Sequence, residues 1–389
     1  MAKYSIEDKT LTDIADAIRE KTKTTAELAP RSMPAAILGI TTGDGESFYI
    51  TGDATALFSR TYSDSVPIEW FERYLSHFCS DKIKTKDLTN LAGMFSENTY
   101  LTEIPFSLNI TSDLTQSRSL RSCFYGMTNL IKLPKINGKV NGIGSFCYNC
   151  QRLADVSALA DVDVDLDVNF IRDSAFYNCC SIRHIPSSFI KKAGRTNMGR
   201  FYNFYYYSFI YCYVLEAIED MGVSRGTLTE NTFDRSFFYC HRLKKLTFET
   251  NDDGTPIVAN WKNQTIDLTY AVGHLYSNTD DSVNKVITQY NSGITKDKRV
   301  NSQEDYERLK NDPDWFTGLL AYSRYNHDSA VETINSLPDT NAYLAANGGT
   351  NTIKFEGAAG AKTDGGAIST LTEEEIAVAA AKGWTVSLE

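Results

Sequence analysis

The chain has 389 residues, a formal net charge of −10, 42% hydrophobic residues and 23% charged residues. This ordinary balance excludes a wholly disordered chain and predicts two to three domains or one elongated repeat array. No apolar run approaches the roughly 20 residues that a membrane-spanning helix needs, so we expect no membrane insertion. The acidic balance argues against nucleic acid as a partner. The 22 Tyr, 20 Phe and 8 Cys need a further explanation.

Residues 1–42 carry the pattern of two short helices. The first has an apolar stripe at helical spacing, formed by Leu11, Ile14, Ala15 and Ile18. The second is predicted from Ser32 to Ile40. Because such a pair cannot bury a core alone, we expect residues 1–42 to attach the chain to other proteins or to form a homo-oligomer. Gly43 and Gly45 then interrupt the chain, and residues 43–87 are predicted to cap the repeats that follow.

The helical segment before this break resembles a short N-terminal module that is common in tail and other minor structural proteins of bacteriophages and prophages. The resemblance covers residues 11–40, which read LTDIADAIREKTKTTAELAPRSMPAAILGI. It implies that residues 1–42 bind other virion proteins. For a phage fibre the usual expectation is a trimer, although the sequence contains no heptad pattern that demands one.

Residues 88–250 contain six copies of one pattern: an aromatic residue, then Cys at +3, and aliphatic residues at +6 and +9. The clearest copy begins at Phe176 and continues with Cys179, Ile182 and Ile185. The copies begin at Phe95, Phe124, Cys147, Phe176, Phe209 and Phe237. Asn98 and Met127 stand at the Cys position of the first two copies. Six copies of this pattern predict repeating units that stack to bury a shared core.

The repeats resemble the leucine-rich repeats of the BspA-like family. This resemblance implies an α/β repeat solenoid in which each Leu-x-x-Leu stretch gives a short strand and the aromatic and Cys positions fill the interior. The intervals between copies are 29, 23, 29, 33 and 28 residues. They are looser than in the family, so we expect additional loops.

The cysteines suggest two kinds of bond, zinc coordination and disulfides. Cys147 and Cys150 form a C-x-x-C pair, but no second such pair or His pair lies at metal-ligand spacing, so we predict no metal site. Cys150, Cys179, Cys212 and Cys240 share one repeat position. We therefore interpret them as reduced thiols in the core, where Cys behaves as a small hydrophobic residue.

Asp161, Asp163, Asp165 and Asp167 alternate with apolar residues, which would place four carboxylates on one face of a strand. Such a row is either a solvated face or a cation site, and we favour the solvated face. The five His residues are scattered, and no nucleophile elbow, G-x-G-x-x-G or P-loop motif is present. We therefore predict that the chain is not an enzyme and has no cofactor.

Residues 201–213 contain a tyrosine cluster within the longest interval between copies, where an exposed loop or platform is expected. Tyrosine is favoured in binding surfaces because it buries a large area at low entropy cost and keeps a hydrogen-bonding tip. The alternative is that these side chains pack the flanks of the repeats or a subunit interface. The candidate binding residues are Tyr202, Tyr205, Tyr206, Tyr207, Tyr211 and Tyr213.

The remaining chain divides into residues 251–320, an irregular or inserted segment, and residues 321–389, a C-terminal repeat and cap. In the cap we predict a helix from Thr370 to Ala380, and strands at 352–355 and 383–386. This arrangement resembles the terminal helix–strand units of phage-borne BspA-like proteins. A cap would cover the open end of a repeat array.

These observations predict a non-enzymatic protein of the bacteriophage virion. We favour a tail fibre or receptor-binding protein that recognises a glycan or protein of the host cell surface. A BspA-like adhesion protein of a bacterial surface is the alternative. It requires an export route, and the polar N-terminal sequence is unlike a secretory signal. A structural decoration or spike protein of the virion is the third interpretation.

Overall fold

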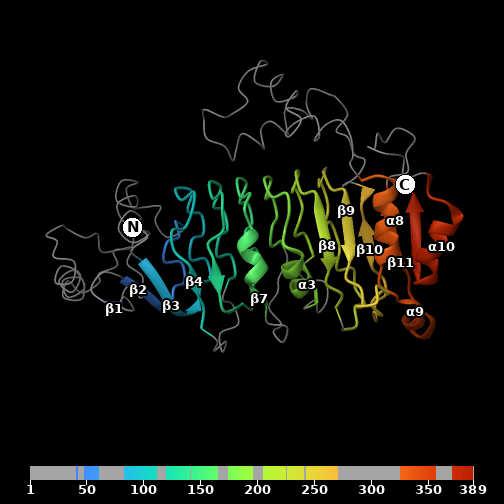
Figure 1. Ribbon diagram of the computed structural model, residues 1–389, viewed down its shortest axis with the longest axis horizontal. Coiled ribbons are helices and arrows are strands. Elements are labelled where there is room, and N and C mark those ends of the chain that lie inside the picture. Colours follow the sequence, from blue (N-terminus) through green and yellow to red (C-terminus); the bar gives the residue numbers. More distant parts are fainter. Residues whose placement is uncertain are drawn as a thin grey trace, which may run out of the picture.

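The fold is described from a computed structural model. The structure describes residues 41–42, 48–60, 83–111, 120–140, 142–164, 174–195, 205–224, 226–240, 242–269, 325–355 and 370–388. The predicted helices within residues 1–40 therefore lie outside the described residues, as do residues 270–320 of the irregular segment. The described elements follow one another in sequence order along the long axis of the molecule, from β2 to α10 (Figure 1).

The N-terminal half of the described chain contains short strands. They are β1 Thr41–Thr42, β2 Phe48–Asp53, β3 Ile83–Asn90, β4 Leu108–Asn109, β5 Ile136–Asn137, β6 Lys139–Val140 and β7 Asp163–Val164. A short 3-10 helix covers Ser157–Asp161. β1 pairs antiparallel with β2, and β2 pairs parallel with β3. β4 pairs with β5, and β6 with β7, both in parallel.

The second half adds longer helices. The elements are α3 Ser187–Arg195, β8 Ala217–Met221, β9 Lys245–Phe248, β10 Thr265–Asp267, α8 His327–Ser336, α9 Asn341–Asn347, β11 Asn351–Phe355, α10 Glu373–Ala381 and β12 Trp384–Leu388. β8 pairs with β9, and β10, β11 and β12 form one parallel sheet. The helix predicted from Thr370 and the strands predicted at 352–355 and 383–386 correspond to α10, β11 and β12.

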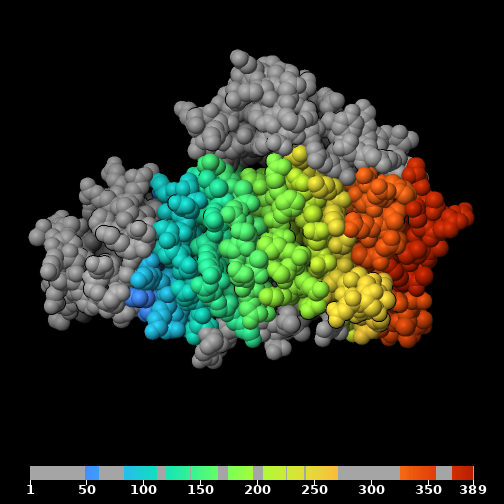
Figure 2. Space-filling view, viewed as in Figure 1, coloured from blue at the N-terminus to red at the C-terminus, as the bar shows by residue number. Residues whose placement is uncertain are grey.

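Neighbouring copies of the repeat are joined by backbone hydrogen bonds at the aromatic position. The N–H of Phe95 donates to the carbonyl of Cys123, that of Phe176 to Ser208, and that of Phe209 to Ser236, at 2.9–3.1 Å. The copies therefore lie side by side, and the colours of the space-filling view change in sequence order along the molecule (Figure 2).

A column of phenylalanine rings runs through the core, one from each copy. Consecutive ring centroids lie 5.1–6.3 Å apart, through Phe58, Phe95, Phe124, Phe146, Phe176, Phe209 and Phe237. All seven rings are buried. Phe58 marks a copy that the pattern did not include. In the copy that begins at Cys147, Phe146 supplies the ring from one residue earlier.

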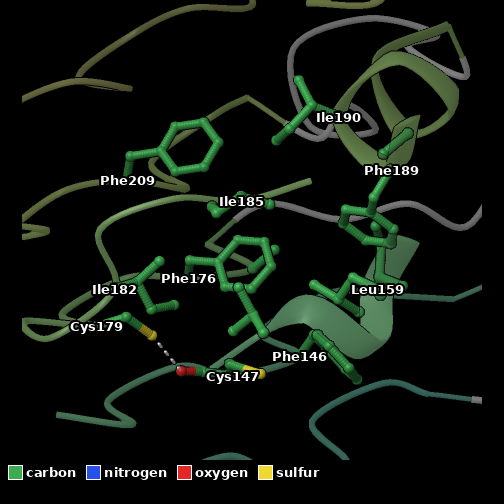
Figure 3. Close-up of a cluster of buried hydrophobic side chains, with 14 of the residues drawn as sticks. Phe146, Cys147, Leu159, Phe176, Cys179, Ile182, Ile185, Phe189, Ile190 and Phe209 are labelled. Carbon is green, nitrogen blue, oxygen red and sulfur yellow. Dashed lines mark hydrogen bonds between the residues drawn. The ribbon is translucent and has the colours of Figure 1, made fainter. Parts of the chain in front are cut away.

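The cysteine position of the repeat is a buried hydrogen-bond donor. The thiol of Cys179 donates to the carbonyl of Cys147 at 3.0 Å, inside the cluster of Figure 3. Cys150, Cys212 and Cys240 make equivalent bonds to Phe124, Phe176 and Phe209. Asn98 occupies the same position and donates to the carbonyl of Phe58. The seven cysteines of the described residues are free thiols, and six are buried in the core.

The prediction of an α/β leucine-rich-repeat solenoid is wrong, because the strands of the repeats do not form one continuous sheet. Across the described ranges the strands form sheets of only two or three strands, and none continues along the repeats. In two copies a helix stands where the strand was predicted. Val156 is followed by the 3-10 helix Ser157–Asp161, and Ile185 is followed by Pro186, which cannot donate to a strand ladder, and by α3.

Around each aromatic position, where no strand was predicted, the residues two before and two after have positive φ. They include Ser174 and Asn178 around Phe176, and Tyr207 and Tyr211 around Phe209. Left-handed residues cannot belong to an extended strand, so the copies are joined there through consecutive turns.

Candidate functional site

The predicted tyrosine cluster does not form one exposed surface. Tyr202 lies outside the described residues. Tyr205, Tyr206 and Tyr213 are buried, with 0%, 7% and 5% of their surface exposed, so they do not form a contact surface. Only Tyr207 and Tyr211 are half-exposed. Tyr205 packs into the shared core, whereas Tyr213 packs with Val214 against Cys180, Tyr211 and Tyr239 in a separate small cluster.

Tyr205 belongs to the packing between α3 and the segment after β8. Its hydroxyl donates to the carbonyl of Gly222 at 3.2 Å, and burial raises its pKa well above the usual value. A Cβ atom at Gly194 would stand 2.0 Å from this hydroxyl, so glycine is required at that position of α3. Tyr205 is therefore a structural residue.

A different set of tyrosines forms a continuous row across five copies. We call it the tyrosine ladder, and it consists of Tyr125, Tyr148, Tyr177, Tyr211 and Tyr239. All five side chains are half-exposed. Consecutive ring centroids lie 5.0, 4.5, 5.5 and 4.9 Å apart. Three contacts are stacked, whereas the Tyr177–Tyr211 contact is edge-to-face at 86°.

The edge-to-face contact marks a change of position within the repeat. Tyr148 and Tyr177 stand one residue after the start of their copies, and each is followed by a left-handed Asn, at 149 and 178. Tyr211 and Tyr239 stand two residues after the start and are themselves left-handed, with φ of 62° and 64°. A bulky residue with positive φ costs about 1–3 kcal/mol and is enriched at functional sites.

Three ladder hydroxyls, those of Tyr148, Tyr177 and Tyr211, have a raised pKa and stay uncharged at neutral pH. Burial, followed by the neighbouring phenols Tyr148 and Tyr211, raises the pKa of Tyr177 to about 12. The pKa values of Tyr148 and Tyr211 are also raised, again mainly by burial. A protonated phenol both donates and accepts a hydrogen bond, so the ladder offers a row of neutral polar groups.

Side-chain amides lie beside the middle of the ladder. The Asn178 amide donates to Oδ1 of Asn149 at 2.7 Å, and the Gln151 amide donates to the same oxygen at 2.9 Å. At the other end, the guanidinium of Arg235 lies 5.7 Å from the ring centre of Tyr207. The groups around the ladder therefore include phenols, amides and the cation Arg235.

The sequence contains a signal for the ladder that is separate from the dense cluster at residues 201–213. A tyrosine follows the first position of the last five copies by one or two residues, and these copies are far apart in the chain. Only stacking of the copies brings the five rings together, and the change from the first to the second position interrupts the periodicity.

Other candidate sites are weaker. An open recess near the N-terminal sheet is lined by residues that include Tyr49, Thr85, Phe106 and Asn109. Its polar groups are partly paired with each other, since Oγ1 of Thr85 accepts from the Asn109 backbone N–H at 2.7 Å. Within the described ranges, no group of three or more His, Cys, Asp or Glu side chains is arranged to hold a metal ion. Asp161 and Asp163 are exposed, whereas Asp165 and Asp167 lie outside the described residues.

Comparison of the chain with models of protein families, with curated proteins and with solved structures found no match. Among the residues that the structure describes, no helix is long and apolar enough to cross a membrane.

Proposed function

We propose that this chain is a recognition protein of a bacteriophage virion, a tail fibre or receptor-binding protein that contacts the host cell surface. In this proposal it is not an enzyme. Residues 1–42 attach it to other virion proteins or to further copies of itself. The sequence resemblance of residues 11–40 to phage structural modules supports this attachment role.

The tyrosine ladder is the observation that supports recognition best. Five half-exposed phenols lie in one row, and two of them hold a left-handed backbone that Asn or Gly would adopt at lower cost. The left-handed backbone itself belongs to the repeat, since Glu97, Asn149 and Asn178 share it at the same position, and the tyrosine side chains are what the last two copies add there. Tyrosine with asparagine is also the composition typical of binding surfaces.

Two experiments test the proposal. Mass spectrometry of purified phage particles, made by a strain that carries the gene, tests for the chain in the virion. The full-length chain, labelled with a fluorophore, is also mixed with intact host cells. We expect a stoichiometric virion component and saturable binding to cells. Presence in particles without cell binding would favour a purely structural virion protein, and absence from particles with cell binding would favour a bacterial adhesion protein.

A further inference from the structure

We propose that the tyrosine ladder binds a neutral, linear glycan chain along its length. This inference rests on the proposed function, because it assigns the chemical class of the receptor. The rings of the ladder follow one another at similar distances. A ligand that contacts every ring therefore needs polar groups repeated along its length, as in a polymer.

The geometry of the rings determines which atoms meet the ligand. Tyr148 and Tyr177 are stacked with an angle of 2° between their planes, and Tyr211 and Tyr239 with an angle of 10°. In these stacked pairs each ring covers a face of its neighbour, and the Tyr177 hydroxyl interacts with those of Tyr148 and Tyr211, so a ligand meets ring edges and a connected row of hydroxyls. Recognition therefore depends on hydrogen bonds rather than on stacking of a flat ligand.

The uncharged groups in the middle of the ladder favour a neutral ligand, and the cation Arg235 lies at one end, near Tyr207 and Tyr211. The ladder phenols whose pKa is shifted stay protonated at neutral pH, and the amides of Asn149, Asn178 and Gln151 carry no charge. The whole chain has a net charge of −10, which repels anionic polymers at long range. Phenol and amide groups each donate and accept, as do the hydroxyls of sugars, so the two sets of groups are complementary.

The test uses calorimetric titration of the full chain with neutral oligosaccharides of two to eight hexose units, made of glucose, galactose, mannose or N-acetylglucosamine. Hyaluronan oligomers of equal length serve as the anionic comparison. The Tyr148→Phe/Tyr177→Phe double variant removes two hydroxyls and keeps the stacked rings. Tyr343→Phe, at a half-exposed tyrosine of α9 outside the ladder, is the matched control. Thermal unfolding confirms that each variant is folded.

We expect binding to at least one neutral series, with an affinity that rises with oligomer length. Each lost hydroxyl bond should weaken binding by about twofold to tenfold, and Tyr343→Phe should leave it unchanged. If the chain binds host cells but no neutral oligosaccharide, the inference is overturned and the proposed function stands. Preference for hyaluronan, or equal binding by the double variant, also overturns the inference. Failure to bind cells counts against the proposed function itself.

Discussion

At the scale of single residues, each repeat position favours a side chain that is either apolar and buried or able to donate a hydrogen bond in the core. The position three residues after the aromatic holds Cys in four copies and Asn in one, and all five side chains donate to the carbonyl at the start of the preceding copy. A buried carbonyl without a partner is costly, so a small side chain with a donor is favoured here. Backbone hydrogen bonding in the core thus accounts for four of the eight cysteines.

Replacing Cys179 tests this role. Cys179→Ala removes the donor to the Cys147 carbonyl and leaves a small cavity, so we expect a loss of about 1–3 kcal/mol in the free energy of unfolding. Cys179→Ser keeps a donor and should lose less. The measurement is urea unfolding followed by circular dichroism. Equal losses for the two variants would show that the hydrogen bond contributes little.

The left-handed tyrosines provide a second prediction. Tyr239→Asn relieves backbone strain, because Asn adopts positive φ more readily, but it removes one stacked ring contact worth about 0.5–1.5 kcal/mol. The two effects oppose each other, so we expect the free energy of unfolding to change by less than about 1 kcal/mol. Calorimetric unfolding measures this change. A loss above about 3 kcal/mol would show that Tyr239 is retained for stability rather than for binding.

At the scale of elements, α8 covers the edge of β9 in place of another strand. Ser329 and Thr333 donate through their hydroxyls to the carbonyls of Lys244 and Leu246, both at 2.6 Å. Ser336 accepts from the Phe248 N–H at 3.1 Å. Residues at i, i+4 and i+7 lie on one helix face, so this stripe follows alternate residues of the strand. The open edge of β9 is thereby paired.

Thr333→Val tests the pairing of helix and strand. Valine has a similar shape but no hydroxyl, so the Leu246 carbonyl loses this buried partner and we expect a loss of about 1–3 kcal/mol. Thr333→Ser, which keeps the hydroxyl, is the control. Hydrogen exchange of the β9 amides should report faster opening in Thr333→Val alone. Unchanged exchange in both variants would mean that apolar packing holds α8 in place.

The C-terminal helices are linked by a pair that depends on pH. Nε2 of His327 lies 3.1 Å from a carboxylate oxygen of Glu375, in the first turns of α8 and α10. Burial lowers the pKa of His327, but its bonds to Asp328 and Glu375 outweigh this effect and raise it above 6.5. The pKa of Glu375 is lowered, first by the Thr372 backbone N–H and further by His327.

The sign of each shift defines the pH range in which this pair stabilises the fold. The raised pKa of His327 gives stability that is present below pH 6.5 and is lost as pH rises through the folded value. The lowered pKa of Glu375 gives stability that is present above pH 4.5 and is lost as pH falls. We expect hydrogen-exchange protection of α10, corrected for intrinsic rates, to be highest between these limits. Glu375→Gln should flatten the profile, and an unchanged profile would contradict the role of the pair.

At the scale of the whole molecule, the sequence predicts the repeats but not the way their backbones join. The spacing of Phe176, Cys179, Ile182 and Ile185 identifies core positions because burial follows periodicity. It does not reveal left-handed backbone at Ser174 or Tyr207, because residues other than Gly and Asn seldom adopt it. It also does not reveal that Val156 and Ile185 lead into helices, where a continuous sheet needs a strand.

The candidate site was predicted less well than the core. The tyrosines within residues 201–213 led to the prediction that Tyr205 and Tyr206 form a binding surface, but both side chains are buried. Closeness in sequence does not place side chains on one face, because adjacent residues of a stacked repeat point in different directions. The tyrosine ladder gathers side chains from copies 23 to 34 residues apart, as between Tyr125 and Tyr148 or Tyr177 and Tyr211. Such a set is recognised only when positions are compared across copies. Tyr211 alone belongs to both sets.

The most direct test of the account is adsorption of the labelled full chain to intact host cells, with and without the Tyr148→Ala/Tyr177→Ala double substitution. Tyr343→Ala is the control, and circular dichroism with thermal unfolding verifies the fold of each variant. If the tyrosine ladder is the recognition surface, the double variant should lose at least about tenfold in affinity for cells, while Tyr343→Ala binds as the unchanged chain does. Equal adsorption of all three proteins would contradict the assignment of this face as the binding site.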